Sequence, residues 1–241
     1  MNILVNGSSV SRGNESWPYY LQDRIGADCN IVNLAQAGSG NTYIHESTVE
    51  EISQRPYDLV LIQWTYANRV DFRVKDIKQF RDTTYTTDYQ SRQNDWPSKV
   101  VWPVNDQEYV QKNWIFGCGY LNEPGDNSLS RAVRGYYEAT DADEHIFSKL
   151  IKIISLQNTL KIQNIPYVFV PYRPITQLAR FKNLTDMIDM SNVFDVSLYK
   201  LSTDYDKTFD ATQHPLPNIQ KQYADSLYQH LLDKGLIRGN S

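Results

Sequence analysis

The chain has 241 residues, of which 41% are hydrophobic and 22% are charged, and its formal net charge is −4. This length suits one α/β domain with a full hydrophobic core. The mildly acidic balance argues against a partner such as DNA, which proteins bind with excess positive charge. No apolar run is long enough to span a bilayer. We therefore expect a single domain over residues 1–241, with neither nucleic acid nor a membrane as its partner.

The cysteine count and the N-terminus suggest a compartment. Two cysteines, Cys29 and Cys118, are too few for a disulfide framework or a zinc site, so we expect free thiols and no metal. The first apolar residues form a short strand instead of the charged-then-apolar pattern of a signal peptide. We expect a cytoplasmic protein, or a component of a particle assembled there, such as a phage.

The first third of the chain alternates short apolar runs with helical patterns. The run over residues 57–63 is continuously apolar in its centre, as in a parallel strand that is covered on both faces. Strands are predicted over residues 2–6, 31–34 and 57–63, and helices over residues 16–25 and 42–53.

The middle of the chain, about residues 71–140, breaks this pattern. It is polar and aromatic, with turn signals at Trp96-Pro97 and Trp102-Pro103. So long a segment is not expected to be one structureless loop. We predict an insertion of short helices and loops that forms a cap or a partner surface.

Regular patterns return after the insertion. Asp141 precedes Glu144 by three residues, as a helix cap does, and helical spacing then continues to about Lys161. A buried strand is predicted over residues 166–170. The last helix, over residues 217–234, has apolar residues four apart: Ile219, Tyr223, Leu227 and Leu231. This alternation favours an α/β fold, a three-layer α/β/α sandwich with a mostly parallel central sheet.

A serine stands where α/β folds place their active sites. Residues 7–13 read GSSVSRG and directly follow the first predicted strand. Ser9 would project from the carboxyl end of the sheet, where turn N–H groups can stabilise an oxyanion. The alternatives are a plain connection or a phosphate-binding loop, although the segment lacks a P-loop lysine and the spacing of a dinucleotide fingerprint.

A histidine and an acid share one late loop. His214 precedes Pro215 and the last predicted helix, and Asp210 stands four residues before it. Serine attack needs a base to take the hydroxyl proton and an acid to orient that base. We predict Ser9, His214 and Asp210 as the catalytic residues, with Asp204 and Asp206 as rivals for the acid. The other histidines lie in helical patterns and are weak candidates: His45, His145 and His230.

Two further loops supply candidate binding groups. Gly38 follows the second predicted strand, where its N–H can approach a substrate oxygen. After the third strand, Thr65 or Asn68 is a candidate side-chain donor to the same oxygen. Trp64 and Arg69 are candidate substrate-binding residues, Arg69 for an anionic group. The alternative for Arg69 is an ordinary surface ion pair.

Together these segments resemble the SGNH (GDSL-type) hydrolase family. The family's first block, Gly-Asp-Ser-x-x-x-Gly, matches residues 7–13 and implies Ser9 as the nucleophile. Its second block implies the N–H of Gly38 as an oxyanion donor, and its last block, before the final helix, implies Asp210 and His214. The resemblance covers the core elements, not the insertion. It implies a flavodoxin-like fold and an oxyanion hole completed by the N–H of Ser9.

Three departures from the family pattern are visible. Ser8 replaces the aspartate of the first block, and the acid stands four instead of three residues before the histidine. The Gly-x-Asn-Asp block is missing, and residues 64–69 (WTYANR) stand in its place. Either Asn68 or Thr65 replaces its asparagine, or the oxyanion hole has one donor fewer, which typically costs about two to three orders of magnitude in rate.

We therefore predict a serine esterase that works through an acyl-enzyme on Ser9, without a cofactor or metal. The expected partner is a small ester or an acetylated glycan, because 17 Tyr and 5 Trp offer stacking surfaces for sugars. Two alternatives remain. The same site can transfer the acyl group to another alcohol, or the domain is a catalytically degenerate module that binds glycans or has a structural role.

Overall fold

A computed structural model describes residues 1–73, 114–117, 135–175, 179–203 and 214–239. Its centre is a four-stranded parallel sheet in the order β2-β1-β3-β6. The strands are β1 (Asn2–Asn6), β2 (Asn30–Asn33), β3 (Leu59–Ile62) and β6 (Tyr167–Phe169). The four predicted strands are therefore confirmed, within one or two residues at each end.

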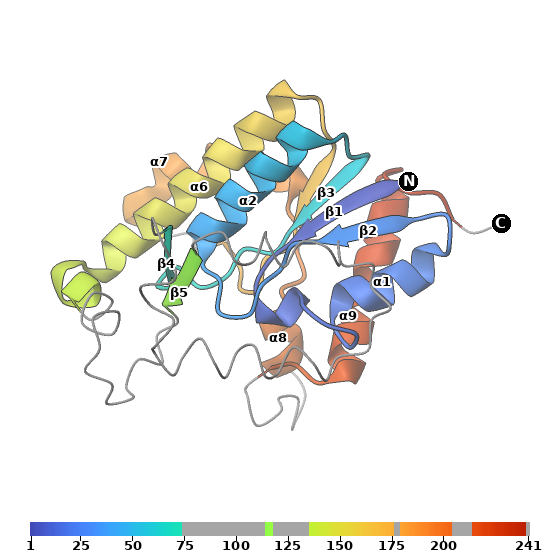
Figure 1. The fold of residues 1–241 in the computed structure, drawn as a ribbon, viewed down its shortest axis with the longest axis horizontal. Helices are drawn as coiled ribbons and strands as arrows, with labels where there is room; N and C mark the ends of the chain where they lie inside the picture. The colour runs from blue at the N-terminus through green and yellow to red at the C-terminus, as the bar shows by residue number, and fades with distance from the viewer. Residues whose placement is uncertain (74–113, 118–134, 176–178, 204–213, 240–241) are drawn as a thin grey trace.

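Helices cover both faces of this sheet (Figure 1). α1 and α9 pack on one face, and α2 and α6 pack on the other. Their bounds are α1 (Trp17–Ile25), α2 (Asn41–Gln54), α6 (Ala142–Ile162) and α9 (Pro217–Asp233). The three-layer α/β/α arrangement with a parallel central sheet is confirmed.

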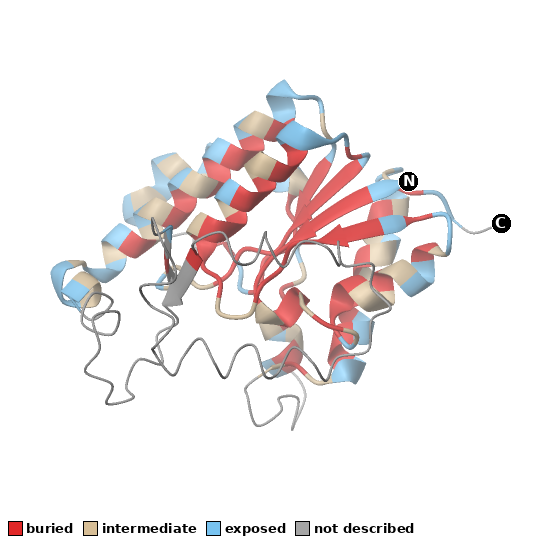
Figure 2. Ribbon diagram, viewed as in Figure 1, coloured by how far each residue is buried: buried red, intermediate tan, exposed pale blue. Residues whose placement is uncertain are grey.

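Side chains alternate across the sheet and so divide the core in two. From β1, Ile3 and Val5 point toward α1 and α9, while Leu4 points toward α2 and α6. The strands are buried along nearly their whole length, as Figure 2 shows. This explains why they read as continuous apolar runs in the sequence.

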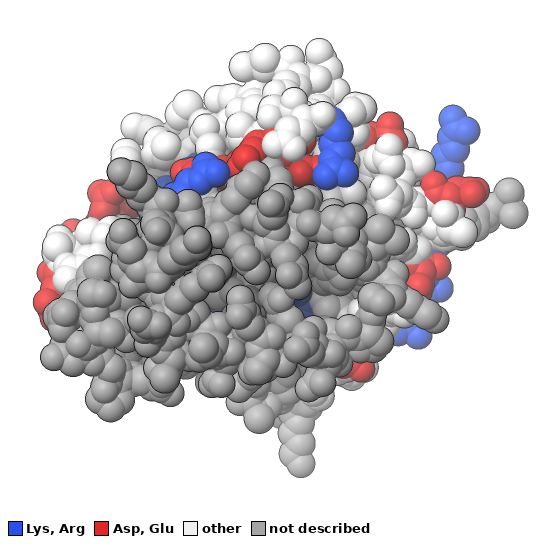
Figure 3. Space-filling view, viewed as in Figure 1, with Lys and Arg blue, Asp and Glu red and all other residues white. Residues whose placement is uncertain are grey.

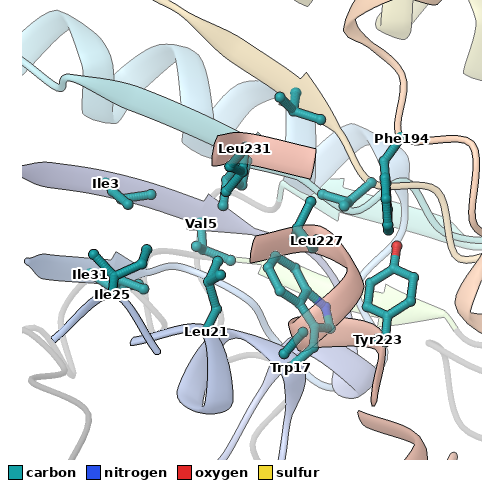
Figure 4. Close-up of a cluster of buried hydrophobic side chains, with 14 of the residues drawn as sticks. Ile3, Val5, Trp17, Leu21, Ile25, Ile31, Phe194, Tyr223, Leu227 and Leu231 are labelled. Carbon is teal, nitrogen blue, oxygen red and sulfur yellow. The ribbon is translucent and has the colours of Figure 1, made fainter. Parts of the chain in front are cut away.

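A cluster of buried apolar side chains packs between the sheet and the helices α1 and α9 (Figure 4). Trp17 and Tyr223 meet edge to face with ring centroids 6.2 Å apart. The stripe predicted for the last helix is confirmed, since each of its four residues is no more than 2% exposed: Ile219, Tyr223, Leu227 and Leu231.

α6 begins as its sequence predicts, because the side chain of Asp141 accepts a hydrogen bond from Glu144 N at 2.8 Å. Its apolar residues are not all buried. Phe147 and Ile151 are 43% and 42% exposed, whereas Lys149 is buried and donates to Thr65 O in the loop after β3.

The predicted insertion contains strand structure that the sequence did not suggest. β4 (Val70–Arg73) and β5 (Trp114–Gly117) form a two-stranded antiparallel sheet beside α2 and α6 (Figure 1). Asp71, taken as the start of a peripheral segment, belongs to the core and accepts hydrogen bonds at the start of α2. The rest of the predicted insertion, residues 74–113 and 118–134, lies outside the described residues.

Short helices connect β6 to the end of the chain. They are η3 (Ala179–Phe181), α7 (Lys182–Thr185), η4 (Met190–Asn192) and α8 (Leu198–Thr203). On the described part of the surface, acidic and basic side chains are mixed (Figure 3). No helix among the described residues has the length and apolar character needed to cross a membrane. Cys29 is a buried free thiol, and Cys118 lies outside the described residues.

Candidate active site

Ser9 lies in a tight turn at the carboxyl end of β1, as predicted. It begins the 3-10 helix η1 (Ser9–Ser11), so its N–H has no acceptor within that helix. The turn needs glycine at position 7, because a Cβ there would lie 2.5 Å from Ser11 Oγ and 3.0 Å from Gln63 Cβ. The hydroxyl of Ser11 bonds Gln63 Oε1, which fixes the turn against the end of β3.

His214 meets Ser9 across 205 positions of sequence. Its Nε2 lies 2.8 Å from Ser9 Oγ, a hydrogen-bond distance. For the serine hydroxyl to donate, Nε2 must be unprotonated and the ring proton must be on Nδ1. This is the arrangement in which a histidine can take the proton of an attacking serine.

The first turn of α9 helps to hold this pair. The side-chain amide of Gln220 donates to Val10 O at 3.2 Å, and its oxygen accepts from Trp17 N at 3.1 Å. Gln220 is buried, so both bonds are shielded from water. One side chain of α9 thus ties the helix that follows His214 to the turn that carries Ser9.

The predicted acid, Asp210, lies outside the described residues, as do its rivals Asp204 and Asp206. Its role therefore stays a prediction.

The loop that carries Gly38 is fastened directly to the nucleophile turn. Ser39 Oγ and Gln36 N both donate to Gly7 O, at 2.9 and 3.3 Å. Gly38 has a φ of 79°, in the left-handed region that glycine enters without strain. The predicted oxyanion glycine and the predicted nucleophile therefore sit on two loops that contact each other.

The two candidates for the third donor differ sharply in their surroundings. Thr65 is buried, and its Oγ1 has no hydrogen-bond partner among the described residues. A buried hydroxyl without a partner is costly and calls for an explanation. Asn68 is exposed, and its carbonyl accepts a bond from the hydroxyl of Tyr137. The structure thus presents Thr65 as a buried donor and Asn68 as a surface residue.

The two predicted substrate-binding residues also differ. Trp64 is fully buried in the core, edge to face with Phe169 at 5.6 Å, so it presents no ring face to a substrate. Arg69 is half-buried and donates to Ser39 O at 3.2 Å. Its predicted alternative, a surface ion pair, has no carboxylate partner within the described part of the chain.

Sequence analysis missed two residues that hold the loop after β3. Asn41 accepts from Thr65 N at 3.1 Å and donates to Tyr66 O at 2.9 Å. Lys149 donates to Thr65 O at 2.8 Å. A lysine on an otherwise apolar helical stripe was the available signal for Lys149, whereas a polar residue that starts a helix, like Asn41, is too common to single out.

The remaining histidines lie in helices, as expected. His45 Nε2 lies 3.0 Å from Ser155 Oγ, and His230 packs on Phe194 with ring centroids 5.1 Å apart. The described residues include no cluster of three or more histidine, cysteine, aspartate or glutamate side chains that could hold a metal ion.

Comparisons with known proteins identify the fold. No protein-family model and no curated protein sequence matches the chain. Among solved structures, a psychrotrophic esterase, EstA, from Pseudoalteromonas sp. is similar at 12% identity, with a TM-score of 0.52 and 97% of each chain covered. TesA is similar at 12% identity and a TM-score of 0.55, over 98% of this chain and 100% of the other. The fold implied by the resemblance to SGNH hydrolases is thereby confirmed.

Proposed function

We propose that this protein is a serine ester hydrolase that works through an acyl-enzyme on Ser9. The observation that carries the proposal is the 2.8 Å contact between Ser9 Oγ and His214 Nε2 at the carboxyl end of a parallel sheet. Ligand sites of open α/β sheets lie at this edge. The fold shared with an esterase from Pseudoalteromonas sp. is consistent with this chemistry.

In the proposed reaction, His214 takes the proton of Ser9 as Oγ attacks the acyl carbon. The tetrahedral intermediate places a negative charge on the former carbonyl oxygen. The N–H groups of Ser9 and Gly38, together with Thr65 or Asn68, would stabilise that oxyanion. His214 then protonates the leaving alcohol, and water, activated by the same imidazole, hydrolyses the acyl-enzyme.

Asp210 is proposed to orient His214. In its neutral form the imidazole must carry its proton on Nδ1, and an acid that accepts this N–H fixes the tautomer and stabilises the charged ring. Asp210 stands four residues before His214, one more than in the family's last block, and a loop can absorb that extra residue.

The proposed substrate is a small ester, with an O-acetyl group on a carbohydrate as the preferred case. Tyrosine rings gather where the loops after β3 and β6 meet: Tyr66 and Tyr172 have ring centroids 5.3 Å apart. The exposed side chain of Arg173 lies 4.7 Å from the Tyr66 ring and 3.9 Å from the Tyr199 ring. Tyr172 itself is buried, so the half-buried rings of Tyr66 and Tyr199 and the exposed Arg173 form this surface. Such a polar aromatic surface suits a sugar better than a long acyl chain.

The proposal is tested by hydrolysis of a short-chain chromogenic acetate ester. Ser9→Ala should abolish turnover without changing the circular dichroism spectrum. The matched control is Ser53→Ala, which removes an exposed hydroxyl of α2 and should leave turnover unchanged. Turnover that survives in Ser9→Ala would exclude Ser9 as the nucleophile.

Two alternative functions give different results in the same assay. An acyltransferase would pass the acetyl group to an added alcohol in competition with water, and the transfer product would accumulate. A catalytically degenerate glycan-binding module would show no turnover and would bind acetylated glycans equally well with or without Ser9→Ala.

A further inference from the structure

A polar pocket lies at the same edge of the sheet, between the start of α2 and the N-terminal half of α6. It has a volume of about 160 Å³ and receives residues from the loop after β3 and from β4. It includes neither Ser9 nor His214. Its charged and hydroxyl-bearing lining includes Thr42, Arg69, Asp71, Ser148, Lys149 and Lys152.

The pocket carries more positive than negative charge. Among the described residues, three cationic side chains line it, from Arg69, Lys149 and Lys152, whereas Asp71 is the one carboxylate. Both oxygens of Asp71 already accept backbone N–H groups, from Gly40 at 2.6 Å and Tyr43 at 2.8 Å. Within the described part of the chain, none of the three cations forms an ion pair.

Lys149 is the most unusual of these cations. Its side chain is buried, yet its ammonium group has a single acceptor among the described residues, Thr65 O. An ammonium group has three N–H donors, and a buried charge without a counter-charge is strongly unfavourable. Burial is the main cause that lowers the pKa of Lys149 to about 8, and the positive charge of Arg173 lowers it further. The ammonium group of Lys149 has no negatively charged partner among the described residues.

Asp71 offers a negative charge only in part, because both of its oxygens already accept hydrogen bonds at the start of α2. Burial raises the pKa of its carboxyl group to about 7, whereas the two backbone hydrogen bonds and the charges of Arg69 and Lys152 act in the opposite direction. A single carboxyl group therefore faces three cations among the described lining residues.

We propose that this pocket binds a small oxyanion: a carboxylate, sulfate or phosphate group. Lys149 and Lys152 supply the charge, and the donors of Arg69 not used for Ser39 O, together with the hydroxyls of Thr42 and Ser148, supply hydrogen bonds to its oxygens. Lys152 already lies 2.6 Å from Ser148 Oγ, so ammonium and hydroxyl are held together.

The site is joined to both loops of the candidate oxyanion hole. Arg69 donates to Ser39 O beside Gly38, and Lys149 donates to Thr65 O. The anion can come from two sources: an acidic group on the ester substrate, which rests on the proposed function, or a free ion. The ligand chemistry is the same for both.

The first test is equilibrium binding of inorganic sulfate to the full-length protein by titration calorimetry at constant ionic strength. Lys152→Gln keeps a polar group near Ser148 but removes a charge, and should weaken sulfate binding about five- to tenfold. Lys149→Met should weaken it further. The matched control is Lys221→Gln, an exposed lysine of α9, which should bind sulfate like the wild type.

A second measurement separates the two sources. The kcat/KM ratio for a carboxylate-bearing ester over its neutral analogue is compared between the wild type and Lys152→Gln. A ratio that falls in the variant assigns the anion to the substrate, and an unchanged ratio together with lost sulfate binding assigns a free ion. Absence of saturable sulfate binding, or binding equal in Lys152→Gln and the wild type, would overturn the proposal.

Sulfate binding does not depend on turnover. If Ser9→Ala binds sulfate normally while no ester is hydrolysed by the wild type, the proposed hydrolase fails and the anion site stands. If hydrolysis is found without sulfate binding, the anion site fails and the hydrolase stands.

Discussion

The two faces of the central sheet are built by different means. Toward α1 and α9 the sheet is packed by aliphatic and aromatic side chains, around Trp17 and Tyr223. Toward α2 and α6 the core also contains buried polar groups: the amide nitrogen of Asn6 lies within hydrogen-bond distance of Ile44 O, Ser47 Oγ and Thr48 Oγ1, at 2.8 to 3.1 Å. The α1–α9 face positions the Ser9–His214 pair by apolar packing and by the hydrogen bonds of Gln220, and the α2–α6 face positions the loops around the pair.

This difference separates what each face contributes. Apolar packing is non-directional and resists change of volume, so it sets where α9, and hence His214, lies against β1. Hydrogen bonds are directional, so Asn41 and Lys149 can fix the orientation of single peptide groups in the loop after β3. Variants in the two faces should therefore fail in different ways.

The largest expected effect comes from the catalytic pair itself. His214→Ala should lower kcat by about four to six orders of magnitude, because Ser9 loses the group that takes its proton. The free energy of unfolding should change little, since His214 is only half-buried. Steady-state kinetics and urea unfolding measure the two quantities. A variant that keeps most of its kcat would show that His214 is not the base.

A cavity in the α1–α9 face should cost stability instead of chemistry. Leu227→Ala should lower the free energy of unfolding by about 2–5 kcal/mol, because Leu227 is fully buried between α9 and the sheet. On the α2–α6 face, Ser47→Ala should cost only about 1 kcal/mol, the typical net value of a hydrogen bond. Equal losses in the two variants would contradict the division between the faces.

The two candidates for the third oxyanion donor are the buried hydroxyl of Thr65 and the exposed side-chain amide of Asn68. Thr65→Val keeps the shape of the side chain but removes its unpartnered hydroxyl, and should lower kcat about 10²- to 10³-fold with KM little changed. Asn68→Ala should leave kcat near the wild-type value. The reverse result would assign the donor role to Asn68.

The last expected effect is a pH dependence of stability from Asp71. Burial raises the pKa of this carboxyl to about 7 in the folded protein, against 3.8 for the unperturbed group. Between these values the folded state binds more protons than the unfolded state, so the free energy of unfolding falls as pH rises. The loss is at most about 1.4 kcal/mol per pH unit.

Asp71→Asn should flatten this dependence between about pH 4 and 7. Urea unfolding at a series of pH values measures it. A wild-type free energy of unfolding that rises over the same range would mean that Asp71 is stabilised as a carboxylate in the folded state.

The sequence was sufficient for the four strands of the central sheet, the helices that cover it, and the Ser9–His214 pair. Strands such as β3 are apolar on both faces, and the stripe of α9 has regular spacing, so local pattern and tertiary burial agree. Ser9 and His214 were found because each borders a predicted element. The 2.8 Å distance shows that the two side chains lie within hydrogen-bond reach of each other. Their catalytic role is a proposal.

The parts that escaped prediction depend on contacts between distant segments. Asp71 looks like the first residue of a polar insertion, yet it accepts two hydrogen bonds at the start of α2. Lys149 interrupts an apolar pattern, and only the position of Thr65 O explains why a charge is buried there. Trp64 follows a strand into a loop, but the fold turns its ring into the core.

The central claim is that Ser9 is a nucleophile activated by His214. Its most direct test is covalent labelling with a fluorophosphonate, followed by peptide mass spectrometry of the wild type and of His214→Ala. The account predicts stoichiometric phosphonylation of Ser9 in the wild type and little or none in the variant. A label on another residue, or equal labelling of Ser9 in both proteins, would contradict it.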